Sequence, residues 1–383
     1  MIARAAATWL PGGVATDVVV EHEGSQITAV RRATSSDPPA ADGLLIPGTI
    51  NAHLHLELSA LAGQIPANQR GFPDWATRLQ ACPRPTEPPQ EAAARLFAAG
   101  VAAVGDVSSR GDTAGVLTAA GLTGVVWKEF LGFDPSRAEA AIEAATQLDT
   151  ADGAFRVRPA AHAIFSTPPA LLAAALAKRA VPATIHLAED PSEEEFLAGE
   201  GVWPEILDQM GIDWRWWAPP GGTPVDYLAS LGLIRSDVLV VHGVWLSDRD
   251  RATLAAAGST VVLCPRSNLH IGGRLADIPA LLRAGVRLAF GTDSLASCDS
   301  LDPLDEIPVV AAAFPHVDAG VWLALATSRG ADALGLARHG RIAPGATPGL
   351  LLLEGIRRPE DLATPSIPRR WLAPPLSAWG HAC

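Results

Sequence analysis

The chain of 383 residues has almost no lysine. Only Lys128 and Lys178 are present, and arginine supplies nearly all of the positive charge. The formal net charge is −12, which is the opposite of the basic surface that the phosphates of a nucleic acid require. We therefore expect no nucleic-acid partner, and we attribute the shortage of lysine to a GC-rich coding bias.

Cysteine is also scarce, and its spacing excludes two kinds of site. Cys82, Cys264, Cys298 and Cys383 lie far apart and form no C-x-x-C pair, so they predict neither a disulfide framework nor a thiolate metal site. Long apolar runs are missing too. The apolar start of the chain ends at residues 11–13 before it could form a signal-peptide core, and no run is long enough to span a membrane. We expect a cytoplasmic protein with no membrane partner.

Apolar, strand-like runs alternate with Ala/Leu-rich helical runs from about residue 44 to residue 340. This alternation is typical of a parallel sheet wrapped by helices, and eight strand–helix units are the number that a closed barrel needs. We therefore predict an α/β fold, a (β/α)8 TIM barrel over residues 47–340. The eight runs are Leu44–Ile50, Val101–Val107, Gly124–Phe130, Val157–Ala161, Ala183–Leu187, Val238–Val241, Val261–Cys264 and Val286–Gly291.

The two ends of the chain show a different sequence pattern, with short strand-like runs and turn residues. Short strand-like runs occur at Val18–Val20 and Ile27–Val30, and again at Leu350–Leu353 in the tail. We predict a small flanking β-sandwich domain built from residues 1–46 and 341–383. The segment Ser192–Pro224 interrupts the barrel rhythm, and we expect a long loop there, on the face where barrels keep their sites.

The first strand is followed by the motif His53-x-His55. Alternate side chains of a strand share a face, so both imidazoles point the same way. Two neutral imidazoles at this spacing can chelate one divalent ion. Taken by itself, the motif could also be a chance pair on a surface strand.

Polar residues stand at three further strand ends. His186 ends the fifth strand and Glu189 follows three residues later, His242 follows the sixth strand, and Asp293 follows the eighth. A buried and unpaired histidine or aspartate would be costly there, so each needs a partner. His242 could instead bond a backbone carbonyl and Asp293 could cap a helix. A single shared site explains all four strand ends at once.

With these motifs in this order, the sequence resembles the amidohydrolase superfamily, in the branch of adenosine-type and guanine-type deaminases and chlorohydrolases. The resemblance extends over nearly the whole chain. It implies one divalent metal ion, zinc being the expected metal and iron or manganese the alternatives. The implied ligands are His53, His55, His186 and Asp293.

Binuclear members of that superfamily bridge two metals through a carboxylated lysine at the end of the fourth strand. In this sequence the fourth strand ends at His162, and Lys128 lies on the third strand beside Glu129. We therefore expect a single metal ion.

The resemblance also implies the catalytic groups. The metal lowers the pKa of a water molecule, and Asp293 takes its proton. Glu189 protonates a ring nitrogen and then the leaving amine, and His242 orients the water and stabilises the oxyanion.

Several runs resemble more specifically those of aminodeoxyfutalosine deaminases of menaquinone biosynthesis. They are Thr223–Leu228, Cys264–Asn268 and Gly291–Ser297, together with Glu57. The likeness implies hydrolytic deamination of a 6-aminopurine nucleoside. Aminodeoxyfutalosine is the expected substrate, with adenosine or methylthioadenosine as further ones.

Four residues are candidates for binding this substrate. His162 matches a family histidine that contacts substrate, and Ser297 belongs to one of the matching runs. Glu57 could accept a ribose hydroxyl or form a surface salt bridge. Arg266 could hold a carboxylate or serve as a structural hydrogen-bond hub. Trp75, Trp214, Trp216 and Trp217 could stack on an aryl group or simply pack.

Two other functions are compatible with the sequence. One is a different amidohydrolase, such as a guanine deaminase, an imidazolone or lactam hydrolase, or a chlorohydrolase. The pair His186-x-x-Glu189 favours a heteroaromatic ring with a nitrogen to protonate. The other is a catalytically silent structural relative, which would have lost ligands that are all present here. A homodimer is common among relatives.

Overall fold

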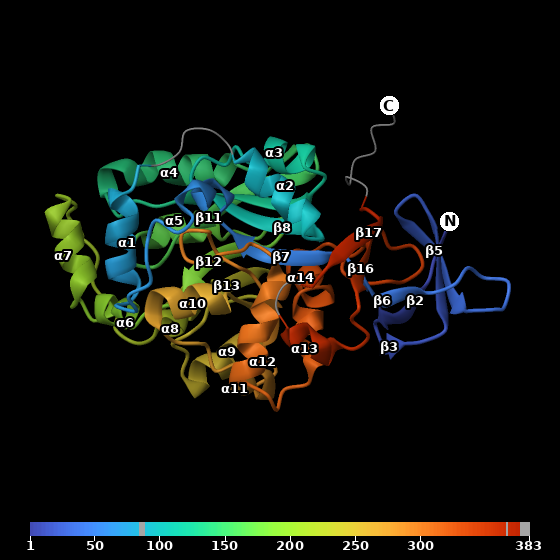
Figure 1. Ribbon diagram of the computed structural model, residues 1–383. Coiled ribbons are helices and arrows are strands. Elements are labelled where there is room, and N and C mark those ends of the chain that lie inside the picture. The colour runs from blue at the N-terminus through green and yellow to red at the C-terminus, as the bar shows by residue number, and fades with distance from the viewer. Residues whose placement is uncertain (84–88, 365–366, 376–383) are drawn as a thin grey trace.

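The structure, a computed structural model, describes residues 1–83, 89–364 and 367–375. Its central strands run parallel in two sheets (Figure 1). The first contains β7 (Thr49–Leu54), β8 (Val101–Ser108), β9 (Thr123–Phe130) and β11 (Phe155–Ala161), with the short antiparallel β10 (Thr150–Asp152) at its edge. The second contains β12 (Ala183–Leu187), β13 (Val238–His242), β14 (Thr260–Leu263) and β15 (Arg287–Phe290).

The two sheets approach each other at both edges. At one seam Leu54 forms a parallel bridge with Asp293, and at the other the backbone N–H of His186 donates to the carbonyl of His162 at 3.0 Å. This is an α/β fold of the TIM-barrel type. The strands that the structure describes form two four-stranded parallel ladders, and these do not join into one continuous closed ladder. The predicted parallel α/β architecture is therefore shown, whereas the predicted closure of the barrel is not.

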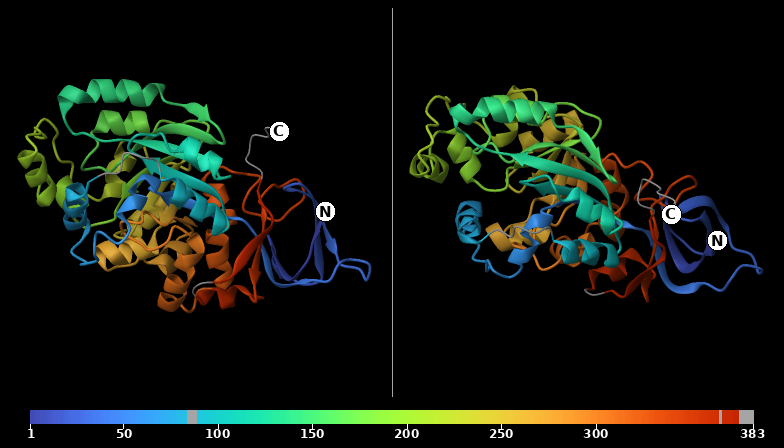
Figure 2. Two further views of the ribbon diagram at one scale, coloured as in Figure 1. Left: turned by 45° about the horizontal axis from the view of Figure 1, so that its top comes forward. Right: turned by 90° about the horizontal axis from the view of Figure 1, so that it is seen from above.

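Helices lie outside the strands (Figures 1 and 2). Among the described helices the longest is α4, with 13 residues, and none is long and apolar enough to cross a membrane. The helices are α1 (Phe72–Ala81), α2 (Gln90–Ala98), α3 (Ala114–Ala119), α4 (Pro135–Gln147), α5 (Pro169–Ala175), α6 (Ser192–Leu197), α7 (Val202–Gln209), α8 (Pro224–Ser230), α9 (Asp248–Ala257), α10 (Pro265–Gly272), α11 (Ile278–Arg283), α12 (Ile307–Ala313), α13 (Ala319–Leu325) and α14 (Ser328–Ala333), with 3-10 turns η1 (Leu56–Leu61), η2 (Pro303–Glu306) and η3 (Pro359–Ala363).

The predicted first strand, Leu44–Ile50, is wrong in its bounds. The chain forms two strands there, β6 (Ala41–Pro47) and β7, and they belong to different sheets. Gly48 separates them at a point where a Cβ would lie 2.7 Å from the side chains of Ala102 and Trp371. Residues 43–54 are all buried, so the sequence stays apolar across the break between β6 and β7 and gives no sign that one strand ends and another begins.

The long loop predicted over Ser192–Pro224 is also wrong, because this segment contains α6 and α7. Each helix is short and follows a proline or glycine, Pro191 before α6 and Gly201 (φ +81°) before α7. Trp203 and Leu207 are one helical turn apart and both buried. That i, i+4 pair was the signal for the second helix.

Strands from both ends of the chain lie together (Figure 2). β1 (Ile2–Ala3), β4 (Val18–Glu23) and β5 (Gln26–Arg32) form one sheet. β6 joins β2 (Ala5–Leu10), β3 (Gly13–Ala15), β16 (Leu350–Glu354) and β17 (Arg369–Ala373) in another. Leu45 packs among the terminal strands, whereas its neighbours Leu44 and Ile46 pack into the main core. Because β6 serves both cores, a domain boundary at residue 46 stays a prediction.

Candidate active site

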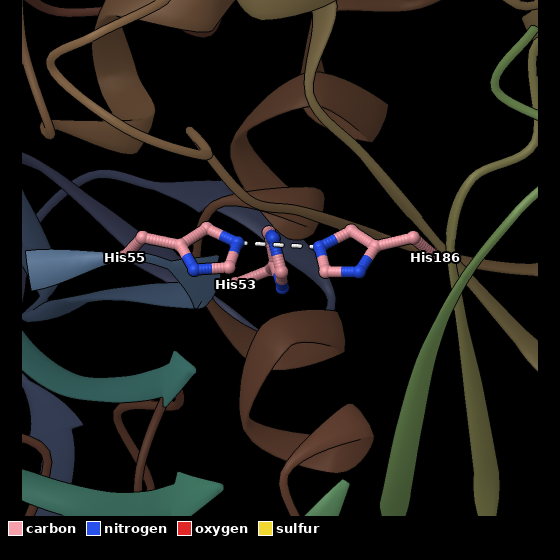
Figure 3. A group of neighbouring side chains, drawn as sticks. All are labelled: His53, His55 and His186. Carbon is pink, nitrogen blue, oxygen red and sulfur yellow. Dashed lines mark hydrogen bonds between the residues drawn. The ribbon is translucent and has the colours of Figure 1, made fainter. Parts of the chain in front are cut away.

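Three imidazoles converge where β7 and β12 end (Figure 3). Nε2 of His55 lies 3.2 Å from Nε2 of His186, and one ring nitrogen of each of His53, His55 and His186 falls within 4.8 Å of the others. The predicted alternation therefore places His53 and His55 at one point, and the fifth strand brings in His186. The three ring nitrogens can hold one metal ion.

His53 carries the strongest structural sign of a ligand. Its side chain is fully buried, and neither of its ring nitrogens has a hydrogen-bond partner among the described residues. Burial, with the neighbouring His55, lowers the pKa of His53 well below its usual value, and burial does the same for His186. These imidazoles are neutral, so their lone pairs are free to coordinate a cation. A divalent ion fits this donor set and would supply the partner that His53 lacks.

Asp293 lies beside the imidazoles with its two carboxylate oxygens in different surroundings. Oδ1 is 3.9 Å from Nε2 of His53 and 3.6 Å from Nε2 of His55. Oδ2 accepts hydrogen bonds from the hydroxyls of Ser267 (2.5 Å) and Ser297 (2.9 Å). The two serines hold Oδ2, so Oδ1 faces the place where a fourth metal ligand is expected.

Glu189 and His242 face each other across the same space. Nε2 of His242 lies 3.6 Å from Oε2 of Glu189, and Oε1 of Glu189 is buried without a described partner. Burial, and then the carboxylate of Asp293, raises the pKa of Glu189 well above its ordinary value. Burial lowers the pKa of His242 to about 4. The arrangement gives a protonated carboxylic acid beside a neutral imidazole, which suits proton donation into the site.

Three non-glycine residues of this region adopt positive φ: Ala188 (+53°), His242 (+74°) and Asp293 (+64°). The left-handed conformation is sparsely populated by such residues and costs free energy, and it tends to occur at functional sites. Two of the three are predicted catalytic residues. This strained backbone turns their side chains at the strand ends toward the imidazoles.

The run Cys264–Asn268 contacts two of the predicted catalytic side chains. Ser267, at the start of α10, bonds Asp293, and the amide nitrogen of Asn268 lies 3.0 Å from Nδ1 of His242. Because an amide nitrogen only donates, the ring proton of His242 is placed on Nε2, toward Glu189. One short helix thus positions two of the catalytic side chains.

Arg266 and Ser297 do not take the substrate-binding places that the sequence predicted. Arg266 does not line the cavity; its guanidinium bonds Glu306 (2.9 Å) and Asp299 (2.6 Å), which supports the alternative of a structural hub. Ser297 is fully buried behind Asp293. Neither placement can be deduced from the linear sequence, because they depend on side-chain direction at the start of α10 for Arg266 and in the turn after Asp293 for Ser297.

The site opens onto a cavity of about 240 Å³. Glu57 lines it and accepts bonds from the hydroxyl of Ser108 (3.0 Å) and the N–H of Ser109 (3.1 Å), so its carboxylate is fixed. Nδ1 of His162 lies 2.7 Å from the Ser166 hydroxyl. The polar groups lining the cavity are His55, Glu57, Glu129, His162, Ser166, His186, Glu189, His242, Asp293 and Gln80.

Sequence reasoning did not assign Glu129 to the site. It follows the apolar part of β9, its Oε1 is buried without a described partner, and it lies 3.8 Å from Nδ1 of His186. Its position at a strand end was the available signal. Glu129, His162 and His186 form a second group that could hold a metal ion, so the single ion stays a prediction. Of the four candidate tryptophans only Trp75 lines the cavity, and the unpredicted Trp203 joins it.

These features define a hydrolase of the α/β, TIM-barrel type, with a metal-capable histidine cluster and a protonated acid at the carboxyl ends of parallel strands. A model of the Amidohydrolase family matches residues 44–375. The chain belongs to this family, as the order of its motifs predicted.

Similar proteins agree with this placement. The chain is 30% identical over 346 residues to the aminodeoxyfutalosine deaminase of Deinococcus radiodurans, covering 85% of this chain and 82% of the relative. It is 29% identical over 377 residues to a 5-methylthioadenosine/S-adenosylhomocysteine deaminase of Haloarcula marismortui, covering 88% and 80%. The predicted resemblance to the deaminase branch is therefore confirmed.

Two solved structures support the fold. The aminofutalosine deaminase of Helicobacter pylori in complex with methylthio-coformycin superposes with a TM-score of 0.77 at 21% identity, covering 94% of each chain. An adenosine deaminase from Xanthomonas campestris with bound zinc gives a TM-score of 0.70 at 24% identity, covering 92% of this chain and 84% of the other.

Proposed function

We propose that this protein is a metal-dependent hydrolase that removes the exocyclic amine of 6-aminopurine nucleosides. One observation carries the proposal: Glu189 is a buried acid with a raised pKa and an unpartnered oxygen, beside His242 and the histidine cluster. Deamination of an aromatic ring needs such an acid, because the ring nitrogen and then the leaving amine must both be protonated. The deaminase names of the relatives point the same way.

His53, His55, His186 and Asp293 would hold the metal ion, and zinc is supported by the zinc in the Xanthomonas neighbour. When bound, the ion supplies a nucleophile by lowering the pKa of a water molecule to near neutrality.

The remaining steps belong to the side chains of this protein. Asp293 accepts the proton of the water through Oδ1, since Oδ2 is already engaged by two serines. Glu189 donates its proton to the ring nitrogen next to the attacked carbon. It then takes up the proton of the new hydroxyl and delivers it to the amine, which leaves as ammonia, and the proton held by Asp293 returns Glu189 to its acid form. His242, with its proton on Nε2, donates to the oxygen that becomes negatively charged. Glu57, fixed by two donors, accepts a hydroxyl of the sugar.

The specific substrate expected from the sequence is aminodeoxyfutalosine, with methylthioadenosine and adenosine as further substrates. The likeness to the Deinococcus radiodurans enzyme supports the first, and the likeness to the Haloarcula enzyme supports the second. The cytoplasmic location and the homodimer also stay predictions.

The test is ammonia release, with the accompanying ultraviolet change, from zinc-loaded protein and each of the three nucleosides. We expect turnover of at least one. Turnover of aminodeoxyfutalosine far above the others would support a role in menaquinone biosynthesis. No turnover of any 6-aminopurine nucleoside by protein that retains its metal would refute the proposed reaction.

A further inference from the structure

The outer part of the cavity is apolar on the sides formed by α1, α7 and the segment after β9. We call these five lining residues the apolar chamber: Trp75, Leu79, Leu131, Ile206 and Met210. Figure 1 shows α1 and α7 beside each other at one end of the molecule. The rings of Phe72 on α1 and Trp203 on α7, whose centroids lie 6.0 Å apart, connect the two helices and line the same cavity.

Two chamber residues are unusually exposed for their type. Leu131 is 57% exposed and Met210 is 61% exposed, and both line the same cavity. Single exposed apolar side chains are ordinary on a protein surface. Two of them at the mouth of a cavity that ends at the catalytic groups form a surface that an apolar part of a substrate would cover.

The charges lining the cavity all have one sign. The charged lining groups are the carboxylates of Glu57, Glu129 and Asp293, Glu189 being a protonated acid, and no arginine or lysine lines the cavity within residues 1–83, 89–364 and 367–375. Arg266, the cation predicted to receive a substrate carboxylate, is held by two acidic side chains elsewhere. The buried indole N–H of Trp75 has no described partner, but it is a neutral donor. A negatively charged substituent would therefore meet no compensating charge from the described lining residues.

We propose, on the basis of the proposed function, that the apolar chamber recognises the sugar-side substituent of the nucleoside by apolar contact alone. It selects an uncharged alkylthio or aryl group, and it gains nothing from a carboxylate on that group. Methylthioadenosine is then preferred over adenosine and over S-adenosylhomocysteine. The aryl ring of aminodeoxyfutalosine is recognised, but its carboxylate is not.

The test compares kcat/KM for matched substrates. Methylthioadenosine should exceed adenosine by about 10- to 100-fold, the range that small apolar groups give in a fitting pocket. The neutral methyl ester of aminodeoxyfutalosine should be used at least as well as the acid. The inference is overturned if adenosine equals methylthioadenosine, or if the acid exceeds its ester about tenfold, the effect of 1.4 kcal/mol of charge recognition.

A pair of variants tests the chamber itself. Met210→Arg places a cation at the mouth and should raise the ratio of acid to ester turnover about tenfold. Gln209→Arg is the matched control: it adds the same charge one residue earlier, at an exposed position that does not line the cavity, and it should leave the ratio unchanged. An equal effect of both variants, or of neither, would refute the assignment.

Failure of this inference can be told apart from failure of the proposed function. If adenosine is deaminated but kcat/KM is the same for methylthioadenosine and adenosine, only the chamber assignment is wrong. If no nucleoside is turned over, the proposed reaction is wrong, and the ratio of calorimetric dissociation constants for methylthioadenosine and adenosine then decides the chamber assignment.

Discussion

Removing the hydroxyl of Ser267 should weaken the metal site without unfolding the protein. The serine is fully buried and donates to Oδ2 of Asp293 at 2.5 Å, and Ser297 donates to the same oxygen at 2.9 Å. A hydrogen bond to a charged group contributes about 1.5–3 kcal/mol, which corresponds to roughly 10- to 100-fold in a binding constant. In Ser267→Ala the carboxylate keeps one donor of two and can rotate away from the imidazoles.

Zinc affinity, measured by competition with a chromophoric chelator, should fall by about 10- to 100-fold in Ser267→Ala, and kcat of the zinc-saturated variant should fall as well. Ser25→Ala is the control, because Ser25 is equally well buried but its hydroxyl has no described partner and lies far from the site, between β4 and β5. The double variant Ser267→Ala/Ser297→Ala should lose more than either single one. A zinc affinity and kcat within twofold of the parent for Ser267→Ala would show that the serines do not position Asp293.

Three further results are expected. Glu189→Gln should retain zinc but lose about 10²- to 10⁴-fold in kcat, because the amide cannot donate the acid proton. The activity of the parent enzyme should decline as the pH rises through the raised pKa of Glu189. Near-normal deamination by the variant would remove Glu189 from the mechanism. Burial raises the pKa of Asp106 from 3.8 to about 7, so its contribution to stability is fully present below pH 4 and is lost as the pH rises through 7. Urea unfolding at pH 5 and pH 8 should show a smaller difference for Asp106→Asn than for the parent, and an identical difference would contradict the assigned shift. Removing the metal with a chelator should lower the melting temperature, since an ion at 100 times its Kd contributes about 2.7 kcal/mol, and added zinc should restore it; an unchanged melting temperature would argue against a bound ion.

Much of the site could be predicted because its residues stand at the ends of buried strands. His53, His55, His186, His242 and Asp293 each follow a short apolar run, and in parallel sheets such ends meet on one side. The sequence therefore predicts which residues lie together in the site, although it does not predict the distances between them. Two predictions of secondary structure were wrong. The first strand was misplaced because the residues on both sides of the break at Gly48 are equally buried. The loop over Ser192–Pro224 was predicted because its prolines and glycines are typical of loops, although short helices lie between them.

The substrate side of the cavity could not be predicted in the same way. Its walls come from α1 and α7, and whether Trp75 or Met210 faces the cavity depends on how each helix is rotated against its neighbours. Arg266 illustrates the same limit for charge. Its sequence context resembles a substrate-binding run, yet Glu306, 40 residues later, takes its guanidinium.

The seam between β7 and the end of β15 has a consequence for biosynthesis. Asn51 donates to the hydroxyl of Thr292 at 2.7 Å, across 241 positions of the chain, and Leu54 pairs with Asp293 beside it. His53 and His55 are therefore made early in translation, whereas Asp293 is made about 240 residues later, after the chain between them. Contacts so distant in sequence form late, because the intervening chain must close first. Tight zinc binding would accordingly mark chains that extend past Asp293, and chains that stop before it would carry the histidines without that carboxylate.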